Sequence, residues 1–344
     1  MYVIRASEER NEKATEFETK SLLYIMDHYK NNDKLAFIAI DFFNDLTGVN
    51  NFADTCYDIQ SKGIKNIKPK QLGSFLVTLY RNYVSTLNFT EFYLCIDSLG
   101  PTLKNCIQDK KIFSYDDFDN EIQKTILEGL KDACMTKDYF EDKSKVNDMD
   151  ISTFLKKVNF IILDKTKEEY VKNAVDYNIT VIDDIYFKKV FKEIRDFQSS
   201  KKNNNLEGTI IHSISCLFQY DKYVEISQIK MMIISRITSQ YVVKDYKSCP
   251  KAFINTLASV DETIREEFLE NCQNDYFRML VNINDQQAYW ELFENIFTIV
   301  SNNPTLDIDA IYNKLDTAKM KRIQFLNYNS CRYFISIIKE GIKC

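Results

Sequence analysis

The pattern of apolar and polar positions in the first hundred residues predicts a helix, three strands, a second helix and a fourth strand, in that order. The first helix carries apolar residues at a spacing of three or four, at Leu22, Ile25, Met26 and Tyr29. The strands are short and apolar, at residues 34–43, 45–49, 55–62 and 91–98. The second helix has a wide apolar face, formed by Leu72, Phe75, Leu76, Leu79, Tyr80 and Tyr83. This order predicts a small mixed sheet with helices packed on it.

The rest of the chain is mainly helical in its pattern. Helical periodicity continues at residues 118–133 and 187–194, whereas the apolar segment 160–163 is either a further strand or part of a helix. The polar segment KKNNN, residues 201–205, is the predicted linker. Beyond it, apolar helical faces recur at residues 226–237, 289–300 and 331–338. We therefore predict an α/β domain at residues 1–200, followed by an all-α domain at residues 206–344.

Composition narrows the functions open to this 344-residue chain. It has only 7 Gly and 4 Pro, too few for a turn-rich all-β fold, and it contains no Gly-rich loop of the kind that binds nucleotide phosphates. Its only two histidines, His28 and His212, and the absence of a G-x-S-x-G motif argue against a His-rich metal site or a serine triad. Any catalysis is therefore expected to use carboxylates, amides and lysines.

The net charge and the cysteine content indicate the charge of the protein surface and the cell compartment that we expect. A net charge of -5 excludes a uniformly basic surface but leaves room for a local basic face. The 9 cysteines form no C-x-x-C pair and follow no signal peptide, which is typical of reduced thiols in a cytoplasmic protein. No stretch of about 18 apolar residues occurs, so we expect no membrane association.

Candidate chemistry lies between the first and third predicted strands. Asp58, Gln60 and Lys62 share one face of their strand because side chains alternate. If the preceding strand is its neighbour, Asp41 and Asp45 converge on the same end of the sheet. Such oxygen ligands suit Mg²⁺ or Mn²⁺. A metal held by Asp45 and the Gln60 carbonyl would polarise a phosphodiester and activate water, and Lys62 would orient that water or neutralise developing charge.

The segments IDFFND and YDIQSKG, followed by the second helix and EFYLCID, resemble the PD-(D/E)XK nuclease superfamily in its Q-x-K variant. The resemblance covers about residues 14–100 and, more loosely, the chain to residue 200. It looks closest to effector nuclease domains of bacterial anti-phage systems of the Lamassu and CBASS types. It implies a restriction-endonuclease-like core, with Asp45 and Gln60 as metal ligands and Lys62 as the catalytic lysine. Glu18 and Asp41 match positions of possible further ligands.

The sequence departs from the stricter motif at one position, and this departure lowers the metal affinity that we expect. Gln60 stands where the stricter motif has an acid, and its neutral carbonyl lowers metal affinity unless Asp58 or Glu18 helps. Asp58 is either a ligand or a solvated edge residue. The sequence alone also allows Gln60 and Lys62 to lie on an ordinary exposed strand face, and Glu18 on an exposed helix face.

A basic stretch follows the motif. Residues 59–90 contain no Asp or Glu, and their basic residues are Lys62, Lys65, Lys68, Lys70 and Arg81. We predict that Lys65, Lys68, Lys70 and Arg81 contact the phosphate backbone of double-stranded DNA. The alternative is a solvated helix entry.

Together these features predict a metal-dependent DNA endonuclease, the effector of an anti-phage defence system. A free nuclease would cut its host, so we expect control by self-association or by an operon-encoded regulator, such as an SMC-like or other ATPase or a nucleotide sensor. The helical domain would mediate this assembly, most simply as a homo-oligomer. The competing hypothesis is a catalytically inactive nuclease fold that serves as a scaffold or binding subunit, and a third is a helical adaptor.

Overall fold

The computed structural model describes residues 2–4, 12–29, 34–138, 140, 142–174, 184–202, 206–230, 232–233, 249–282, 286–303 and 305–341. The chain divides into two compact units. The first unit comprises Met1–Ala174 and Phe187–Ile229, and the second comprises Val175–Tyr186 and Lys230–Cys344. Each unit is described by itself.

A seven-stranded mixed sheet forms the centre of the first unit, in the order β6-β7-β5-β4-β3-β2-β9. β4 and β5 pair in parallel, as do β5 and β7, while the other neighbours are antiparallel. The strands are β2 (Phe37–Ile40), β3 (Leu46–Val49), β4 (Cys56–Lys62), β5 (Phe89–Ile96), β6 (Ile112–Ser114), β7 (Val158–Ile162) and β9 (Tyr223–Glu225). This confirms the predicted mixed sheet and identifies segment 160–163 as part of a strand.

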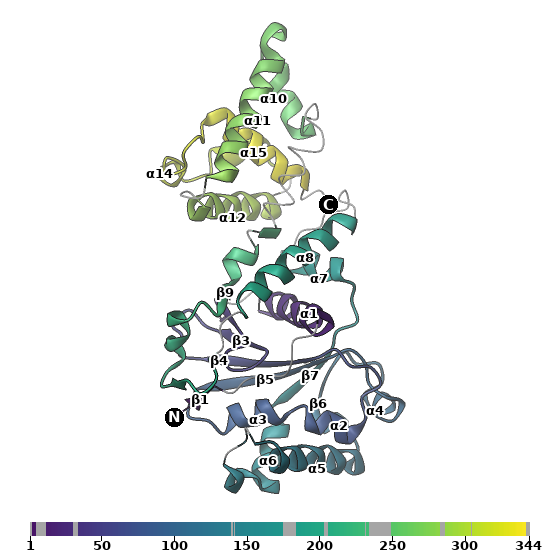
Figure 1. Cartoon of the computed structure of the whole chain (residues 1–344). Coiled ribbons are helices and arrows are strands. Elements are labelled where there is room, and N and C mark those ends of the chain that lie inside the picture. The colour runs from purple at the N-terminus through teal and green to yellow at the C-terminus, as the bar shows by residue number, and fades with distance from the viewer. Residues whose placement is uncertain are drawn as a thin grey trace. The chain divides into compact units, whose positions relative to one another are not determined.

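Helices cover both faces of this sheet (Figure 1). α1 (Glu12–His28) lies on one face, against β4 and α7 (Lys167–Asn173). The other face carries α2 (Pro69–Ser74), α3 (Val77–Tyr83), α5 (Asn120–Thr136) and α6 (Asp148–Leu155). The unit also contains α4 (Pro101–Ile107), α8 (Asp184–Ser200) from Phe187 onward, and the 3₁₀ helices η1 (Tyr115–Asp117), η2 (Lys143–Lys145) and η3 (Ile214–Gln219). The predicted α/β core is thus confirmed.

The helix predicted over residues 72–83 is in fact two short helices, α2 and α3. α2 packs backbone to backbone on α5 through two glycines. A Cβ atom at Gly73 would lie 2.0 Å from the carbonyl oxygen of Ile126, and one at Gly129 would lie 2.1 Å from that of Lys70. α3 instead packs on β4 and β5 of the sheet. The apolar stripe runs through both helices because both bury the same face, so periodicity alone did not reveal the break.

The first unit extends further along the chain than the sequence predicted. The sequence places residues 206–229 in the predicted helical domain, but β9 pairs with β2 at the edge of the main sheet. β8 (Ile210–Ile211) pairs with β1 (Tyr2–Val3) in a separate two-stranded sheet. Strands of two or three residues are too short to leave a recognisable alternation in the sequence. Residues 203–205 of the predicted linker and Ile237 of the predicted apolar face lie outside the described residues.

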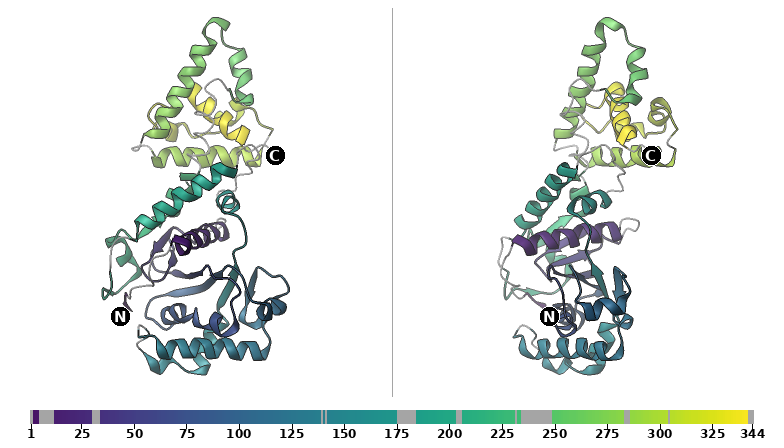
Figure 2. Two further views of the ribbon diagram at one scale, coloured as in Figure 1. Left: turned by 45° about the vertical axis from the view of Figure 1, so that its right-hand side comes forward. Right: turned by 90° about the vertical axis from the view of Figure 1, so that its right-hand side faces the viewer.

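All regular elements among the described residues of the second unit are helices. Its helices are α10 (Ile254–Ala258), α11 (Arg265–Val281), α12 (Gln286–Asn302), α13 (Ile308–Tyr312), α14 (Thr317–Met320) and α15 (Tyr328–Gly341), with 3₁₀ helices η4 (Lys251–Phe253) and η5 (Glu262–Ile264). α15, yellow in Figure 2, packs against α11, α12 and α13. Its buried residues include Cys331, Phe334, Ile335 and Ile338, the stripe seen in the sequence. None of the helices in the described part of the chain is long and apolar enough to cross a membrane.

Candidate active site

The turn between β2 and β3 brings an acidic residue to the strand that carries the Gln-x-Lys triplet. The turn begins at Asp41, whose φ of 50° is left-handed, and it closes with a hydrogen bond of 3.2 Å from the Asp41 amide to the Asp45 carbonyl. β3 and β4 pair antiparallel, with Leu46 opposite Ile59. The residue before Leu46 is therefore next to the residue after Ile59, which places Asp45 beside Gln60.

Two hydrogen bonds hold the Asp45 carboxylate against β4. The Gln60 side-chain amide donates to Oδ2 of Asp45, and the backbone amide of Ser61 donates to the same oxygen at 2.9 Å. Asn44 fixes the backbone of Asp45, because Oδ1 of Asn44 accepts a hydrogen bond from the backbone amide of Asp45 at 2.9 Å. Asp45 and Gln60 thus come together as the sequence predicted.

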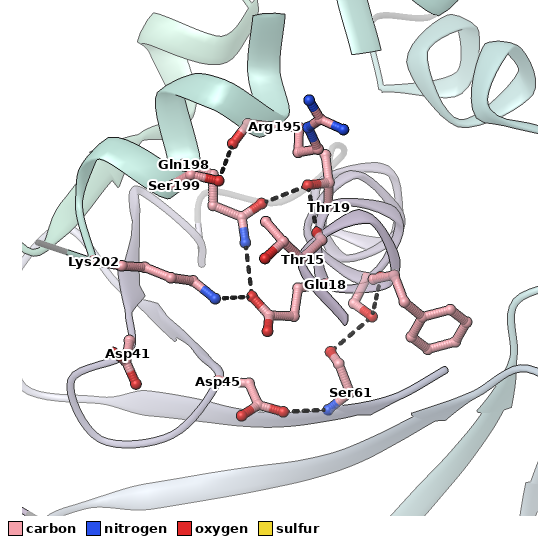
Figure 3. A network of polar contacts seen from close by, with 12 residues as sticks. Thr15, Glu18, Thr19, Asp41, Asp45, Ser61, Arg195, Gln198, Ser199 and Lys202 are labelled. Carbon is pink, nitrogen blue, oxygen red and sulfur yellow. Dashed lines mark hydrogen bonds and ion pairs between the residues drawn. The ribbon is translucent and has the colours of Figure 1, made fainter. Parts of the chain in front are cut away.

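α1 lies close over this part of β4. Ser61 donates to Ser21 of α1 at 2.8 Å, and Gly63 approaches so closely that a Cβ there would lie 3.0 Å from Phe17. Glu18, on the same helix, is 8% exposed. Burial and, secondly, the nearby Asp45 carboxylate raise the pKa of Glu18 to about 7, despite the opposing effect of Lys202. Figure 3 shows the Glu18 carboxylate on the side of α1 that faces Asp45.

Two residues near the end of α8 contact Glu18, and sequence reasoning found neither. The Lys202 ammonium forms an ion pair with Oε2 of Glu18. The buried Gln198 donates to the same oxygen at 3.3 Å and accepts from Thr19 at 2.9 Å (Figure 3). In the sequence, Lys202 belongs to the polar segment predicted as a linker, so nothing distinguished it from a solvated lysine.

Asp41 lies at the other end of the turn and has its own cationic partner. The Lys222 ammonium is 3.7 Å from Oδ2 of Asp41 and donates to the Asp41 carbonyl at 3.4 Å. Lys222 immediately precedes β9 and is only 2% exposed. The Asp41 carboxylate contributes to raising the pKa of Glu18, although less than Asp45 does. Residues 206–229, beyond the predicted nuclease core, thus supply a lysine at its candidate site.

Asp58 is neither a solvated edge residue nor placed to offer its carboxylate to a metal. It is fully buried, and its two oxygens accept hydrogen bonds from Asn44 at 3.0 Å and from Asn82 of α3 at 2.7 Å. The Tyr2 hydroxyl lies 2.9 Å from both Asn82 Oδ1 and the Phe43 carbonyl oxygen, and its single proton is available to either acceptor. Asp58 therefore supports the turn that carries Asp45.

Lys62 and the basic stretch lie at the end of β4 and beyond it. Lys62 is half-buried, and its ammonium is 5.9 Å from the centre of the Phe75 ring. Lys65 and Lys68 are exposed in the connection that follows. Lys70 is exposed but pairs with Asp132 of α5 at 2.7 Å. Arg81 donates to the Tyr2 hydroxyl at 2.6 Å and stacks over its ring, so it is already engaged by the N-terminal strand.

The donor atoms at this site fit a hard divalent cation. Among the described residues, no three His, Cys, Asp or Glu side chains gather closely enough to bind a metal by themselves. Asp45 and Glu18 supply two carboxylates whose mutual repulsion a cation would relieve, and Gln60 supplies an amide. The amide donates its NH₂ group to Asp45 here, so binding through its oxygen requires the amide to rotate. Two carboxylates and one neutral oxygen suit Mg²⁺ or Mn²⁺ completed by water.

No protein-family model matches the chain, and no curated protein matches it. Two structures of the Acinetobacter baumannii Cap4 SAVED/CARF-domain containing receptor are similar in part. The structure with the cyclic trinucleotide 2'3'3'-cAAA has a TM-score of 0.39 and 9% identity over 79% of this chain and 61% of the receptor chain. The structure with 3'3'3'-cAAA has a TM-score of 0.38 and 8% identity over 77% and 59%. The chain thus spans about three fifths of the receptor's length, and similarity at this level assigns it neither a family nor a function.

Proposed function

We propose that the first unit is a metal-dependent DNA endonuclease of the PD-(D/E)XK type. One observation carries the proposal: Asp45 is held against Gln60 and Ser61 of β4 by two hydrogen bonds. Asp45, the acid that precedes β3, therefore meets the Gln of the Gln-x-Lys triplet on the neighbouring β4, and Glu18 of α1 is close enough to Asp45 to be affected by its charge. The contact between Asp45 and Gln60 supports the proposal, because the resemblance implies that these two residues bind one metal ion.

In this proposal, Glu18 and Asp45 bind the cation with their carboxylates and Gln60 adds its amide oxygen after rotation. A divalent ion held there supplies Lewis-acid polarisation of the phosphate and a water of lowered pKa. The hydrogen bond from the Ser61 amide keeps the Asp45 carboxylate oriented. Burial of Glu18 keeps bulk water away from its carboxylate, which strengthens its attraction for any cation.

Lys62 stabilises the negative charge that develops on the phosphate, or orients the attacking water. It follows Gln60 by two residues on β4, so alternation directs both side chains to the same side of the strand. The exposed Lys65 and Lys68 continue from it along the connection to α2, where they would bind the phosphate backbone of DNA.

The test is cleavage of supercoiled plasmid DNA by the purified chain with Mn²⁺. We expect nicked and linear products, and we expect none from Asp45→Ala or Lys62→Ala at the same protein concentration. Asp164→Ala and Lys111→Ala are matched controls, because these residues form an exposed ion pair with each other at 2.5 Å. Cleavage by Asp45→Ala at the wild-type rate would contradict the proposal.

A catalytically inactive scaffold is the second candidate, and one observation favours it. The Gln60 side chain is neutral, and the described residues hold no cluster of three acidic, His or Cys ligands. Such a protein would bind DNA through Lys65 and Lys68 without cutting it. DNA binding by a wild-type chain that never cleaves, with Mn²⁺ and the operon-encoded regulator both present, would support the scaffold over the nuclease.

We further propose that the nuclease acts in anti-phage defence and that the second unit controls it by self-association or by binding the operon-encoded regulator. The resemblance of residues 14–100 to effector nucleases supports the first part. Exposed aromatic residues on the second unit support the second part, since Phe277, Phe325 and Tyr328 are each 41% to 49% exposed. Light scattering of the full chain and of Phe277→Ser/Phe325→Ser tests this role: a reduced mass is expected for the variant if these residues lie in the interface.

A further inference from the structure

The oxygen of Glu18 that faces α8 accepts two donors that both come from the end of that helix. Oε2 of Glu18 accepts from Gln198 at 3.3 Å and pairs with the ammonium of Lys202. The Glu18 and Lys202 side chains are only 11% and 12% exposed, so this ion pair is largely shielded from water. A shielded pair is attracted more strongly than a surface pair and is screened little by salt.

This pair occupies one of the two oxygens of a carboxylate that the proposed metal centre needs, and it holds an ammonium next to that centre. A carboxylate oxygen that binds an ammonium closely cannot take a divalent ion at about 2.1 Å, the distance usual for Mg²⁺, without moving the ammonium away. Two like charges brought together at a shielded site also repel each other strongly. The Lys202 ammonium and a divalent cation are therefore competitors for Glu18.

We propose that Lys202 acts as an internal cation that holds the Glu18 position in the metal-free protein and is exchanged for the metal when the site is loaded. This inference rests on the proposed nuclease function, because it assumes that the metal binds at Glu18 and Asp45. Gln198 is the positioning residue in this exchange: it is fully buried, bridges Thr19 and Glu18, and keeps the carboxylate in place when Lys202 leaves. Metal affinity is then set by a residue from the segment after α8.

The neighbouring lysine provides a matched control. Lys201 has the same charge and also forms an ion pair, but its partner is Asp221, whose side chain is 77% exposed. Lys201→Met therefore removes one charge from the same place in the chain without altering Glu18. Lys202→Met removes the competitor while keeping a side chain of similar length.

The first experiment measures Mn²⁺ binding to the full chain, without DNA, from the electron paramagnetic resonance signal of the unbound ion. Lys202→Met is expected to bind Mn²⁺ about tenfold more tightly than the wild type, equivalent to about 1.4 kcal/mol. Lys201→Met is expected to match the wild type. Binding by Lys202→Met that is equal to or weaker than binding by Lys201→Met would overturn the inference.

The second experiment uses the wild-type protein and so does not depend on a variant folding. An acetylating reagent modifies exposed lysine amines, and mass spectrometry of peptides gives the rate at each lysine. Saturating Mn²⁺ is expected to raise acetylation of Lys202 at least threefold, because its ammonium is released from a site that is 12% exposed. Acetylation of Lys201 gives the internal reference. An unchanged ratio of Lys202 to Lys201 with saturating Mn²⁺ would overturn the inference.

Asp45→Ala distinguishes failure of this inference from failure of the proposed function. If the wild type binds Mn²⁺ and Asp45→Ala does not, the metal centre stands, and the behaviour of Lys202 alone decides the exchange. If the wild type and Lys202→Met both fail to bind Mn²⁺, the proposed metal centre is wrong, and so is the proposed exchange of Lys202 for the metal.

Discussion

The carboxylate of Asp58 supports the turn that carries Asp45 through Asn44. Oδ1 of Asp58 lies 3.0 Å from Nδ2 of Asn44, and Oδ1 of Asn44 accepts from the backbone amide of Asp45 at 2.9 Å. Asn82 holds the second oxygen of Asp58 at 2.7 Å. The fully buried Asp58 thus fixes the position of the half-buried Asp45, and the ionisation of Asp58 affects the stability of the fold.

The stability of the first unit should depend on pH through Asp58. Burial raises the pKa of Asp58 from its ordinary value of 3.8 to about 7, against the effect of the hydrogen bonds from Asn82 and Asn44. The folded chain therefore keeps a proton that the unfolded chain loses between these pH values. The stabilising contribution is complete below about pH 4 and is lost as pH rises to about 7, with a slope of up to about 1.4 kcal/mol per pH unit.

Urea denaturation of the wild type and Asp58→Asn at several pH values checks this. The free energy of unfolding of the wild type should fall relative to that of the variant as pH rises from about 4 to about 7. Glu18 titrates in both proteins, so its contribution cancels in the difference. A difference that is constant across this pH range would show that Asp58 has an ordinary pKa in the folded protein.

The close packing of α2 on α5 predicts a large effect of two conservative substitutions. Gly73→Ala or Gly129→Ala places a methyl group about 2 Å from a backbone carbonyl oxygen of the facing helix, and backbone cannot move aside as a side chain can. We expect each to lower the free energy of unfolding by about 3 kcal/mol or to separate the two helices. Glu128→Ala, an exposed position on α5, is the control and should change stability little. Wild-type stability of both glycine variants would contradict this backbone contact.

Local patterns in the sequence predicted most of the fold. α1 and α15 have periodic apolar residues over many positions, β4 follows a short predicted strand, and each lies where the sequence predicts it. β8 and β9 were missed because two or three residues carry no periodicity, and they become strands only by pairing with β1 and β2. The break between α2 and α3 was missed because the apolar stripe runs through both helices, while the close packing of α2 on α5 involves Gly129 of a distant segment.

In the candidate site too, the contact between neighbouring strands could be predicted from the sequence, whereas the contacts between distant segments could not. Asp45 directly precedes β3, and Gln60, 15 residues further on, lies on β4 of the same short hairpin, so their meeting follows from local chain order. Lys202 is 184 residues from Glu18, and Lys222 is 181 residues from Asp41. No rule of residue spacing relates such distant positions. The sequence also does not distinguish a lysine that pairs with a buried acid from a lysine that is exposed to solvent. Asp58 was misjudged because alternation gives the face of a strand but not what packs on it.

The basic stretch predicts the salt dependence of DNA binding. Replacing the exposed Lys65 and Lys68 with Glu should weaken binding and flatten the logarithmic salt dependence, by about 0.9 for each phosphate contact that is lost. Lys70→Glu should have a smaller effect on binding because Lys70 already pairs with Asp132. Fluorescence anisotropy with labelled duplex DNA at several salt concentrations measures both. An unchanged slope for Lys65→Glu/Lys68→Glu would place the DNA on another face of the protein.

Substitutions of Asp45 and of Lys62 should differ in their effects on metal binding and on DNA cleavage. Asp45→Ala removes a charged ligand, so Mn²⁺ affinity and DNA cleavage should both be lost. Lys62→Met removes only the ammonium that acts on the phosphate or the water, because the carboxylates of Glu18 and Asp45 stay in place and Asp45 keeps its hydrogen bond from the Ser61 amide. Its Mn²⁺ affinity should therefore stay near the wild-type value, while cleavage falls by about 10²- to 10³-fold. Lys111→Met, on an exposed lysine paired with Asp164, should change neither quantity. Lys62→Met that cuts as fast as wild type would remove Lys62 from catalysis, and Asp45→Ala that binds Mn²⁺ normally would move the metal away from the β2–β3 turn.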